Sequence, residues 1–139
     1  MTTEVAIIGG GAAGFVAAIT AAKSGKKVVI LERKERVLKK VLVTGNGRCN
    51  MTNVKADITH YFGKNIDSIE NILDSFTPKD TMEFFNELGI ICNEEERGKV
   101  YPLSGQAASI VDALRFEAEK LGIVTETEFY VRKVEKDGF

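Results

Sequence analysis

The chain has 139 residues, of which 44% are apolar and 28% charged, a composition that suits one globular domain and excludes a disordered chain. The formal net charge is −1 at pH 7 and no long run of one sign occurs, so we expect neither nucleic acid nor a membrane as partner. The cysteines, Cys49 and Cys92, form no CxxC pair, so we expect the cytoplasm, a reducing compartment, and no metal site.

The first elements along the chain predict a βαβ unit over residues 4–32. Residues 5–8 are an apolar run that stops at glycine, as a strand buried on both faces of a parallel sheet does. Residues 12–24 are rich in alanine and predict a helix ended by Gly25. A second buried strand follows at residues 28–31. The charge-free stretch at this end contains four glycines and lacks a basic start, so a strand, a turn and a helix explain it better than a membrane span.

A helical segment is predicted over residues 66–121. Apolar side chains at helical spacing predict a first helix over residues 66–76. The second, over residues 78–88, follows a threonine cap, has a proline in its first turn and is ended by a glycine. Residues 93–106 read as a polar loop, and residues 107–121 predict a third amphipathic helix that a glycine ends.

The last part of the chain, residues 122–139, predicts a strand pair. Residues 129–136 read as a strand, and Asp137 and Gly138 form a typical hairpin turn. Only Phe139 follows that turn. A hairpin without its second strand would leave an open sheet edge. We therefore expect the chain to be the amino-terminal part of a longer protein.

The glycine-rich stretch after the first strand carries the first chemical motif. Residues 9–14 match GxGxxG, follow a strand, open a helix, and precede an acid, Glu32, at the end of the next strand. In a dinucleotide-binding unit Gly9 allows the tight turn, Gly11 lets the backbone approach a pyrophosphate, and Gly14 lets the helix pack on the strand. The phosphates, beside Ala12 and Ala13, lie at the helix amino terminus, and Glu32 accepts hydrogen bonds from a ribose.

The identity of the dinucleotide stays open at this point. Glu32 repels a 2′-phosphate, whereas Arg33 and Lys34 next to it attract one. NADP therefore fits least well, and FAD and NAD both fit the first 32 residues.

The segment LVTGNGRCNMTN, residues 42–53, fits neither a helix nor a strand. It lacks the lysine followed by serine or threonine of a Walker A loop. Gly45, Asn46 and Gly47 can all adopt left-handed backbone angles, which turn successive amides to one side and form a concave donor surface. Arg48 adds a fixed positive fork. Such a surface suits pyrophosphate oxygens or the N1/C2=O edge of a flavin.

The string KxLxTGNGRCNxTN, met from Lys40 to Asn53, resembles the bacterial BaiN-like or YhiN-like flavoproteins, also labelled aminoacetone-oxidase-like FAD-binding enzymes. The GKVYP segment at residues 98–102 is similar to that family's GRVFP segment. Three residues depart from the family pattern: Leu38 stands at an expected glycine, and Lys99 and Tyr101 replace arginine and phenylalanine.

The resemblance implies an FAD domain built from both chain ends around an inserted domain, with this chain as about its first third. It also implies that the loop after the ribose-binding acid, the flavin loop at residues 40–53, runs along the pyrophosphate toward the isoalloxazine. The predicted FAD contacts are then Gly9, Gly11, Ala12, Ala13, Gly14, Glu32, Arg33, Lys40, Thr44, Gly45, Asn46, Gly47, Arg48, Cys49 and Asn50. The family's names cover reduction of steroid double bonds as well as amine oxidation.

Five features have a structural and a functional interpretation. For Arg48, contact with a cofactor or a neighbouring carboxylate is favoured over solvation. Cys49 is read as a small buried residue rather than a redox thiol, and His60 as structural or solvated rather than catalytic. Glu94–Glu96 is read as a solvated loop face. The asparagines of the loop, Asn46, Asn50 and Asn53, are read as turn caps.

The sequence therefore predicts a Rossmann-like, doubly wound α/β fold with a parallel sheet, in the amino-terminal part of an FAD-dependent oxidoreductase. We expect hydride transfer through flavin N5, a small-molecule substrate and linkage to NAD(P)H, with the fragment inactive alone. No side chain stands out as a catalytic acid or base. The alternatives are an NAD-dependent dehydrogenase fragment and a non-catalytic dinucleotide-binding sensor module.

Overall fold

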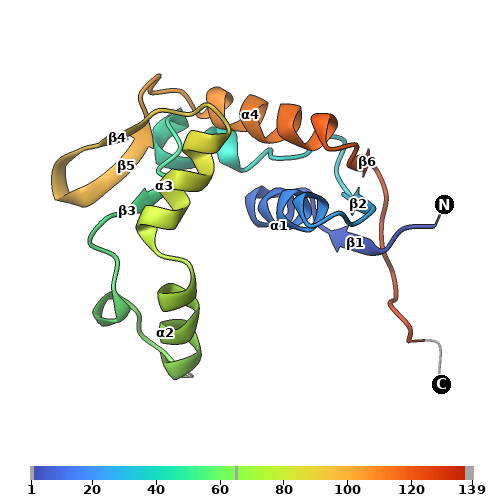
Figure 1. The fold of residues 1–139 in the computed structure, drawn as a ribbon, viewed down its shortest axis with the longest axis horizontal. Coiled ribbons are helices and arrows are strands. Elements are labelled where there is room, and N and C mark those ends of the chain that lie inside the picture. The colour runs from blue at the N-terminus through green and yellow to red at the C-terminus, as the bar shows by residue number, and fades with distance from the viewer. Residues whose placement is uncertain (1, 65, 137–139) are drawn as a thin grey trace. The chain divides into compact units, whose positions relative to one another are not determined.

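The computed structural model describes residues 2–64 and 66–136 of the chain (Figure 1). The chain forms two compact units. Unit 1 comprises residues 1–41 and 114–139, and unit 2 comprises residues 42–113. Each unit has its own small sheet.

Unit 1 contains a parallel sheet with strand order β1-β2-β6. The strands are β1 (Val5–Ile8), β2 (Val28–Leu31) and β6 (Val124–Glu126), and β2 pairs in parallel with both neighbours. Helix α1 (Ala12–Lys23) connects β1 to β2 and packs against both strands (Figure 1). The predicted βαβ unit and the Rossmann-like fold class are therefore confirmed.

Helix α1 begins and ends where the sequence predicts. Phe15, Ala18 and Ile19 form its buried face. Ser24 caps its carboxyl end and is followed by Gly25, whose φ of +81° a side chain would disfavour. This fixes the direction in which the chain enters β2.

Strand β1 corrects one expectation, because it is not buried on both faces. Its residues alternate between half-buried and exposed, and Ile8 is 59% exposed. In contrast, Val28, Val29 and Ile30 of β2 are all buried. The physical reason is position: in the described sheet β1 lies at the edge, and α1 covers only one of its faces.

Unit 2 contains an antiparallel sheet with strand order β3-β5-β4. Its strands are β3 (Thr52–Asn53), β4 (Cys92–Glu94) and β5 (Lys99–Pro102). The predicted polar loop at residues 93–106 is therefore wrong over residues 93–102, which belong to a β-hairpin. Buried Val100 and Tyr101 anchor this hairpin, and Arg97 and Gly98 turn it with positive φ angles.

The helices confirm the predicted helical pattern. They are α2 (Ile66–Ser75), α3 (Pro78–Glu87) and α4 (Ala107–Lys120). Helix α3 contacts β3 and β4, while α2 contacts a short 3₁₀ turn at Ile58–His60. Helix α4 buries a stripe with helical spacing, made of Ala107, Ile110, Val111, Leu114 and Ala118. The boundary between the two units falls within α4.

The predicted strand at residues 129–136 is wrong, because these residues form no strand. The strand of this region is β6, which joins the parallel sheet. The amides of Glu128 and Phe129 donate to Lys34 O and Glu32 O at 3.0 and 2.9 Å, but the chain beyond does not continue the ladder. Tyr130 and Val134 are exposed. An alternating pattern forms a strand only where another strand supplies hydrogen bonds. The predicted Asp137–Gly138 turn lies outside the described residues.

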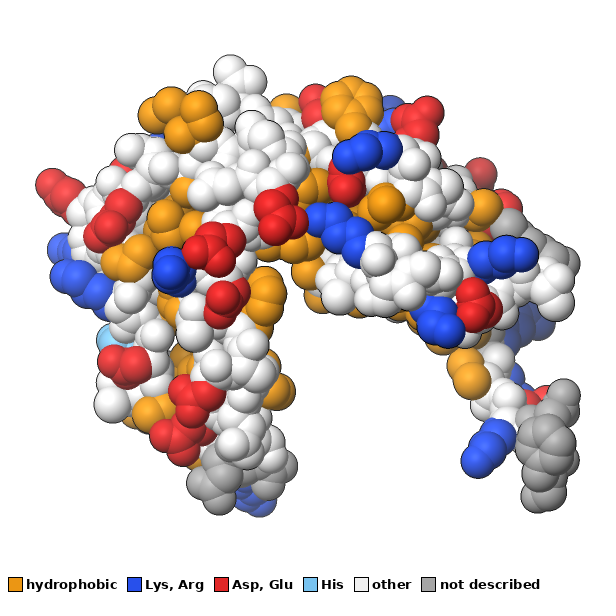
Figure 2. Space-filling model, viewed as in Figure 1, with side chains coloured by type: hydrophobic (Ala, Val, Ile, Leu, Met, Phe, Trp, Pro, Cys, Tyr) orange, Lys and Arg blue, Asp and Glu red, His pale blue; other side chains and the backbone are white. Residues whose placement is uncertain are grey.

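Surface charge follows the mixed composition. On the face shown in Figure 2, positive and negative side chains are interspersed. Among the described residues, no helix is long and apolar enough to cross a bilayer.

Candidate functional site

The glycine-rich turn between β1 and α1 lies in unit 1. Gly9 has a φ of +107°, and its amide donates to Leu31 O at 2.9 Å, which joins the turn to the end of β2. Gly10 is buried, and a Cβ there would lie 2.6 Å from Val37 Cγ1. Gly9, with its positive φ, and Gly10, with its close neighbour, are therefore the positions of this turn that disfavour a side chain.

The two remaining motif glycines have opposite surroundings. A Cβ on Gly14 would lie 2.0 Å from the carbonyl oxygen of Gly9, so α1 can pack this closely on the turn only with glycine there. A Cβ on Gly11 would meet nothing within 4 Å. Gly11 is the N-cap of α1, and the next two residues, Ala12 and Ala13, are exposed. The amino terminus of α1 is therefore open, as an approaching anion requires.

Glu32 directly follows β2 and is tied to the same turn. Its Oε2 accepts from the Gly10 amide at 2.7 Å and its Oε1 accepts from the Lys34 amide at 2.8 Å. The Lys34 amide and, to a lesser extent, the Gly10 amide hold the pKa of this carboxyl below its usual value, while partial burial acts in the opposite direction. Glu32 is therefore a charged, fixed acceptor beside the glycine turn, and each oxygen retains a lone pair for a ligand.

The segment after Glu32 is hydrogen-bonded to the glycine turn. The Leu38 amide donates to Gly10 O at 2.7 Å. Leu38 is 1% exposed and has a φ of +57°, in the left-handed region. The position at which the resemblance leads us to expect glycine is therefore one where the backbone has a glycine-like angle. Arg33 and Lys40, two other predicted contacts, are exposed.

The second group of predicted contacts, Thr44–Asn50, lies in unit 2. The sequence expectation of left-handed angles is confirmed: φ is +55° at Gly45, +55° at Asn46 and +80° at Gly47. Cys49 adds a fourth left-handed residue at +62°. The turn is closed by the Cys49 amide, which donates to Thr44 O at 3.0 Å. Non-glycine residues in this region cost about 1 kcal/mol or more each, so such a turn requires support from its surroundings.

Arg48 is engaged by protein groups rather than by solvent alone. Its guanidinium forms a two-pronged salt bridge with Glu95, in which Nη1 lies 3.1 Å from Oε2 and Nη2 contacts Oε1. Its Cζ also lies 4.1 Å from the centre of the Tyr101 ring. Glu95 raises the pKa of Arg48, and Arg48 lowers the pKa of Glu95. Of the sequence alternatives for Arg48, the neighbouring carboxylate is the one that the structure displays.

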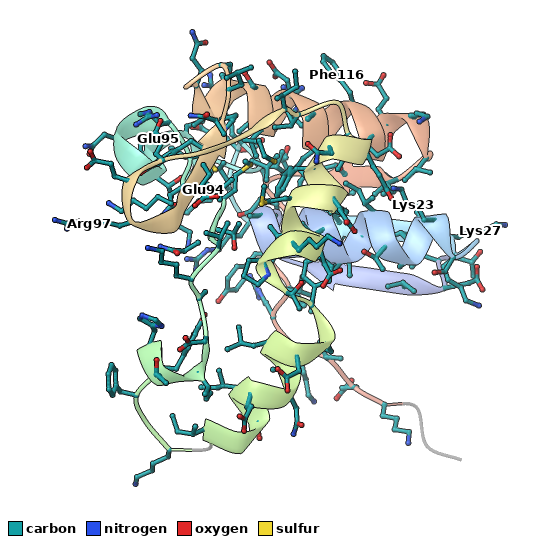
Figure 3. All side chains as sticks on the ribbon, turned by 60° about the vertical axis from the view of Figure 1, so that its left-hand side comes forward. Lys23, Lys27, Glu94, Glu95, Arg97 and Phe116 are labelled. Atoms are coloured by element: carbon teal, nitrogen blue, oxygen red, sulfur yellow. The ribbon has the colours of Figure 1, made fainter. Side chains whose placement is uncertain are left out.

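Glu95 therefore corrects the interpretation of Glu94–Glu96 as a solvated face, because it is partly buried and ion-paired. Figure 3 shows Glu94, Glu95 and Arg97 on the β4–β5 hairpin. A pocket of about 560 Å³ opens beside the ion pair. It is lined by Arg48, Glu95, Glu96, Arg97, Lys99 and Tyr101.

Cys49, His60 and Asn53 behave as their structural interpretations predict, whereas the Asn50 side chain bonds to carbonyl oxygens of two strands rather than capping a turn. Cys49 is buried and burial raises the pKa of its thiol, which disfavours the reactive thiolate. His60 is exposed, with Nδ1 3.0 Å from Asp57 Oδ1. Asn53 caps a turn by accepting from the Lys55 amide at 2.9 Å. Asn50, with its amide nitrogen facing the carbonyls, donates to Thr52 O at 2.9 Å and Val100 O at 3.2 Å.

The structure thus brings the predicted residues together in two sets. The glycine turn and Glu32 form one set in unit 1, and Thr44–Asn50 form the other in unit 2. Glu95 and Tyr101 contact Arg48 of the second set, which the sequence did not indicate. No local signal could have found Glu95, because it is 47 positions away from Arg48 along the chain. Among the described residues, no cluster of His, Cys, Asp or Glu could hold a metal ion.

The unit 1 set fits a dinucleotide on its own chemistry. An open helix amino terminus without a neighbouring side chain at Gly11 suits a pyrophosphate, and a fixed carboxylate at Glu32 suits a ribose diol. This arrangement is common to FAD and NAD sites, so the geometry of unit 1 alone does not select between them.

Known proteins resemble this chain over almost its full length. The model of the HI0933-like protein Rossmann domain matches residues 3–139. The 3-dehydro-bile acid delta(4,6)-reductase of Clostridium scindens is 43% identical over 98% of this chain and 34% of its own length. The ribosomal RNA dihydrouridine synthase of Haemophilus influenzae is 34% identical over 96% of this chain and 33% of its own. The chain thus spans about a third of the curated relatives that it matches.

Solved structures support the fold. The 3-ketosteroid-delta4-(5alpha)-dehydrogenase of Rhodococcus jostii superimposes with a TM-score of 0.62 over 91% of this chain and 38% of its own. The two sequences are 19% identical, so the likeness concerns the arrangement of the backbone.

Proposed function

From the premise that this chain belongs to the HI0933-like family, whose Rossmann domain matches residues 3–139, we propose that it is the dinucleotide-binding part of an FAD-dependent oxidoreductase. Within that family we assign it to the BaiN-like branch, on the basis of the TGNGRCN string. The single observation that carries the proposal is the open Gly11 position at the amino terminus of α1 beside the fixed Glu32 carboxylate.

FAD is preferred to NAD because of the second set of residues. Thr44–Asn50 form a turn with left-handed angles at Gly45, Asn46 and Gly47. A turn of this kind presents main-chain amides to an anionic or electron-rich group, such as a flavin edge. We propose that this turn supplies such amides to FAD, and that Arg33 and Lys40 lie near the FAD phosphates.

The chemistry follows from the cofactor class. Bound FAD would supply hydride transfer through N5 of its flavin ring. The residues of this chain would bind the pyrophosphate at α1, hold the ribose through Glu32 and supply donors to the flavin from the 44–50 turn. Catalytic acids and bases are not assigned to this chain.

We propose a small-molecule substrate, with NAD(P)H as the electron donor and the cytoplasm as location. A relative of 43% identity is named as a bile acid reductase, which supports an apolar, steroid-like substrate class. A relative of 34% identity is named for ribosomal RNA. With a net charge of −1 and interspersed surface charges, this chain offers little attraction for RNA, so the small molecule is the first candidate.

The decisive experiment is the visible spectrum of the protein purified from its complete reading frame. Bound flavin gives absorbance near 450 nm, and we expect that band together with about one FAD released per protein on denaturation. A colourless protein that binds NAD would support the dehydrogenase alternative instead. Flavin that is reduced only once, without turnover by NAD(P)H and a 3-oxo steroid acceptor, would support the sensor alternative.

Hydrogen exchange tests the proposed contacts directly. Added FAD should slow amide exchange at residues 9–14 and at residues 44–50. Residues 66–75 of α2, which carry no predicted contact, serve as the internal control. Protection of residues 9–14 alone would contradict the proposed role of the 44–50 turn.

A further inference from the structure

The 44–50 turn has an unusual backbone that its own sequence does not fully explain. Gly45 and Gly47 adopt left-handed angles without strain, but Asn46 and Cys49 do so as non-glycine residues. Strained angles persist when surrounding groups determine the conformation. Groups outside the turn must therefore determine its conformation.

The β4–β5 hairpin supplies those groups. Tyr101 is 8% exposed, and its Cε1 lies 3.1 Å from the position that a Cβ on Gly45 would occupy. The same ring lies under the Arg48 guanidinium at 4.1 Å. Tyr101 therefore touches the start of the turn and stacks on the side chain that leaves its later part.

Glu95 fixes the other side of the Arg48 fork. Both of its oxygens bind the guanidinium, and Oε1 also accepts from Asn93 Nδ2 at 3.4 Å. The backbone of Glu95 is itself held in the hairpin, because its amide donates to Lys99 O at 2.8 Å. A planar fork held by two oxygens and one ring face has few alternative orientations.

A main-chain connection completes the attachment. The Met51 amide, directly after the turn, donates to Val100 O at 2.9 Å. The turn is thus attached to β5 at its end and held by Tyr101 and Glu95 along its length. All of these residues belong to unit 2.

We propose that Glu95 and Tyr101 are positioning residues that hold the 44–50 turn in its ligand-binding conformation before the cofactor arrives. This inference rests on the proposed function, in which the turn contacts FAD. Arg48 then contributes by anchoring the turn to the hairpin. Preorganisation of this kind raises affinity because the ordering cost is met during folding rather than at binding.

The test compares Glu95→Gln with Glu96→Gln in the full-length protein. Both changes remove one negative charge from the same hairpin turn, but only Glu95 holds Arg48. We expect Glu95→Gln to speed amide exchange at residues 44–50 in the ligand-free protein and to weaken FAD binding about tenfold. Glu96→Gln should change neither.

Further variants separate positioning from direct contact. Arg48→Lys should weaken FAD binding in the wild-type background and have little additional effect in Glu95→Gln, because the fork acts through Glu95. Tyr101→Phe retains the ring face and should bind FAD normally, whereas Tyr101→Leu should behave like Glu95→Gln.

The outcomes separate the two proposals. If the wild-type protein binds no FAD, the proposed function fails, and the exchange of the 44–50 amides still decides whether Glu95 and Tyr101 hold the turn. If the wild-type protein binds FAD and Glu95→Gln matches it in both affinity and amide exchange, only the positioning role is overturned. Weaker FAD binding with unchanged exchange would also overturn it.

Discussion

Two glycines of one motif have separable tasks at the residue scale. Gly14 allows close packing, because a Cβ there would lie 2.0 Å from Gly9 O, whereas Gly11 faces open space. Gly14→Ala should therefore destabilise the protein by about 1–3 kcal/mol, the usual cost of overpacking. Gly11→Ser should leave stability unchanged or slightly raised, since serine is a good N-cap, while it blocks the approach of a pyrophosphate. Urea unfolding and FAD titration measure the two effects.

The pair serves as its own control. Each variant adds a small side chain within the same glycine motif, so a general disturbance of the motif would affect both in the same way. Equal unfolding midpoints for Gly14→Ala and the wild type would contradict the close packing of α1 on the turn. Unchanged FAD affinity in Gly11→Ser would contradict the phosphate site.

Leu38 combines a buried side chain with a left-handed backbone. Replacing leucine removes apolar contacts worth about 2–4 kcal/mol, so both Leu38→Ala and Leu38→Gly should be less stable than the wild type. Glycine adopts a positive φ without strain, whereas alanine at this position keeps the backbone strain. Leu38→Gly should therefore be about 1 kcal/mol more stable than Leu38→Ala. Urea unfolding measures the difference.

Leu114 is the matched control for the prediction that glycine is more stable than alanine at position 38. It is buried like Leu38 but lies inside α4. In a helix glycine is about 1 kcal/mol worse than alanine, so Leu114→Gly should be less stable than Leu114→Ala. The same order at both positions would show that the Leu38 backbone is not left-handed.

At the scale of elements, the sequence predicted correctly those features that depend on residues close together along the chain. Helices α1, α3 and α4 are each followed, two residues after the last helical residue, by a glycine with a positive φ: Gly25, Gly89 and Gly122. Such helix ends are visible in a short window of sequence. The β4–β5 hairpin was missed because its strands are only three and four residues long and its apolar residues are few. Residues 129–136 were assigned wrongly because alternation does not reveal whether a partner strand exists.

The same division applies to the candidate site. The glycine turn and its acid follow from spacing alone, and the left-handed angles at 45–47 follow from residue type. The Arg48–Glu95 pair joins residues 47 positions apart, and no composition rule links one carboxylate of a charged loop to one arginine. Tertiary contacts of this kind require the fold.

Helix α3 offers a test of local specification. Thr77 and Asp80 form a reciprocal capping box, in which the Thr77 amide donates to Asp80 Oδ2 at 2.7 Å and the Asp80 amide donates to Thr77 Oγ1 at 3.3 Å. Thr77→Ala should reduce the free energy of unfolding by about 1 kcal/mol, and Thr77→Ser should largely retain it. Lys79→Ala, at an exposed position of the first turn, is the control. Equal unfolding midpoints for Thr77→Ala and Lys79→Ala would contradict this role.

At the scale of the whole molecule, carboxylates with lowered pKa values recur in both units. The Lys34 amide lowers the pKa of Glu32, Thr77 lowers that of Asp80, and Arg48 lowers that of Glu95. Burial instead raises the pKa of the Cys49 thiol. The charged carboxylates and the neutral thiol are therefore the forms that favour the folded state.

These directions predict a plateau of stability at neutral pH. A carboxyl with a lowered folded pKa stabilises fully above its usual value, 4.5 for Glu95 and 3.8 for Asp80, and loses that contribution as the pH falls through the folded pKa. The Cys49 contribution is present below the usual thiol pKa of 9.0 and is lost as the pH rises through the higher folded value. The urea midpoint should therefore be nearly constant from about pH 5.5 to 8 and fall on both sides.

Two variants test which residues cause the loss of stability at acid and at alkaline pH. Glu95→Gln has one fewer titrating carboxyl, so its midpoint should fall less steeply than that of the wild type as the pH is lowered from about 5.5 to 3.5. Cys49→Ala removes the buried thiol and should make the alkaline limb less steep while leaving the acid limb unchanged. Cys92, whose thiol pKa burial also raises, should retain part of that limb. A wild-type midpoint that rises on acidification would mean that these carboxyls are stabilised in their protonated form, which would contradict the hydrogen bonds that Glu32 and Glu95 accept.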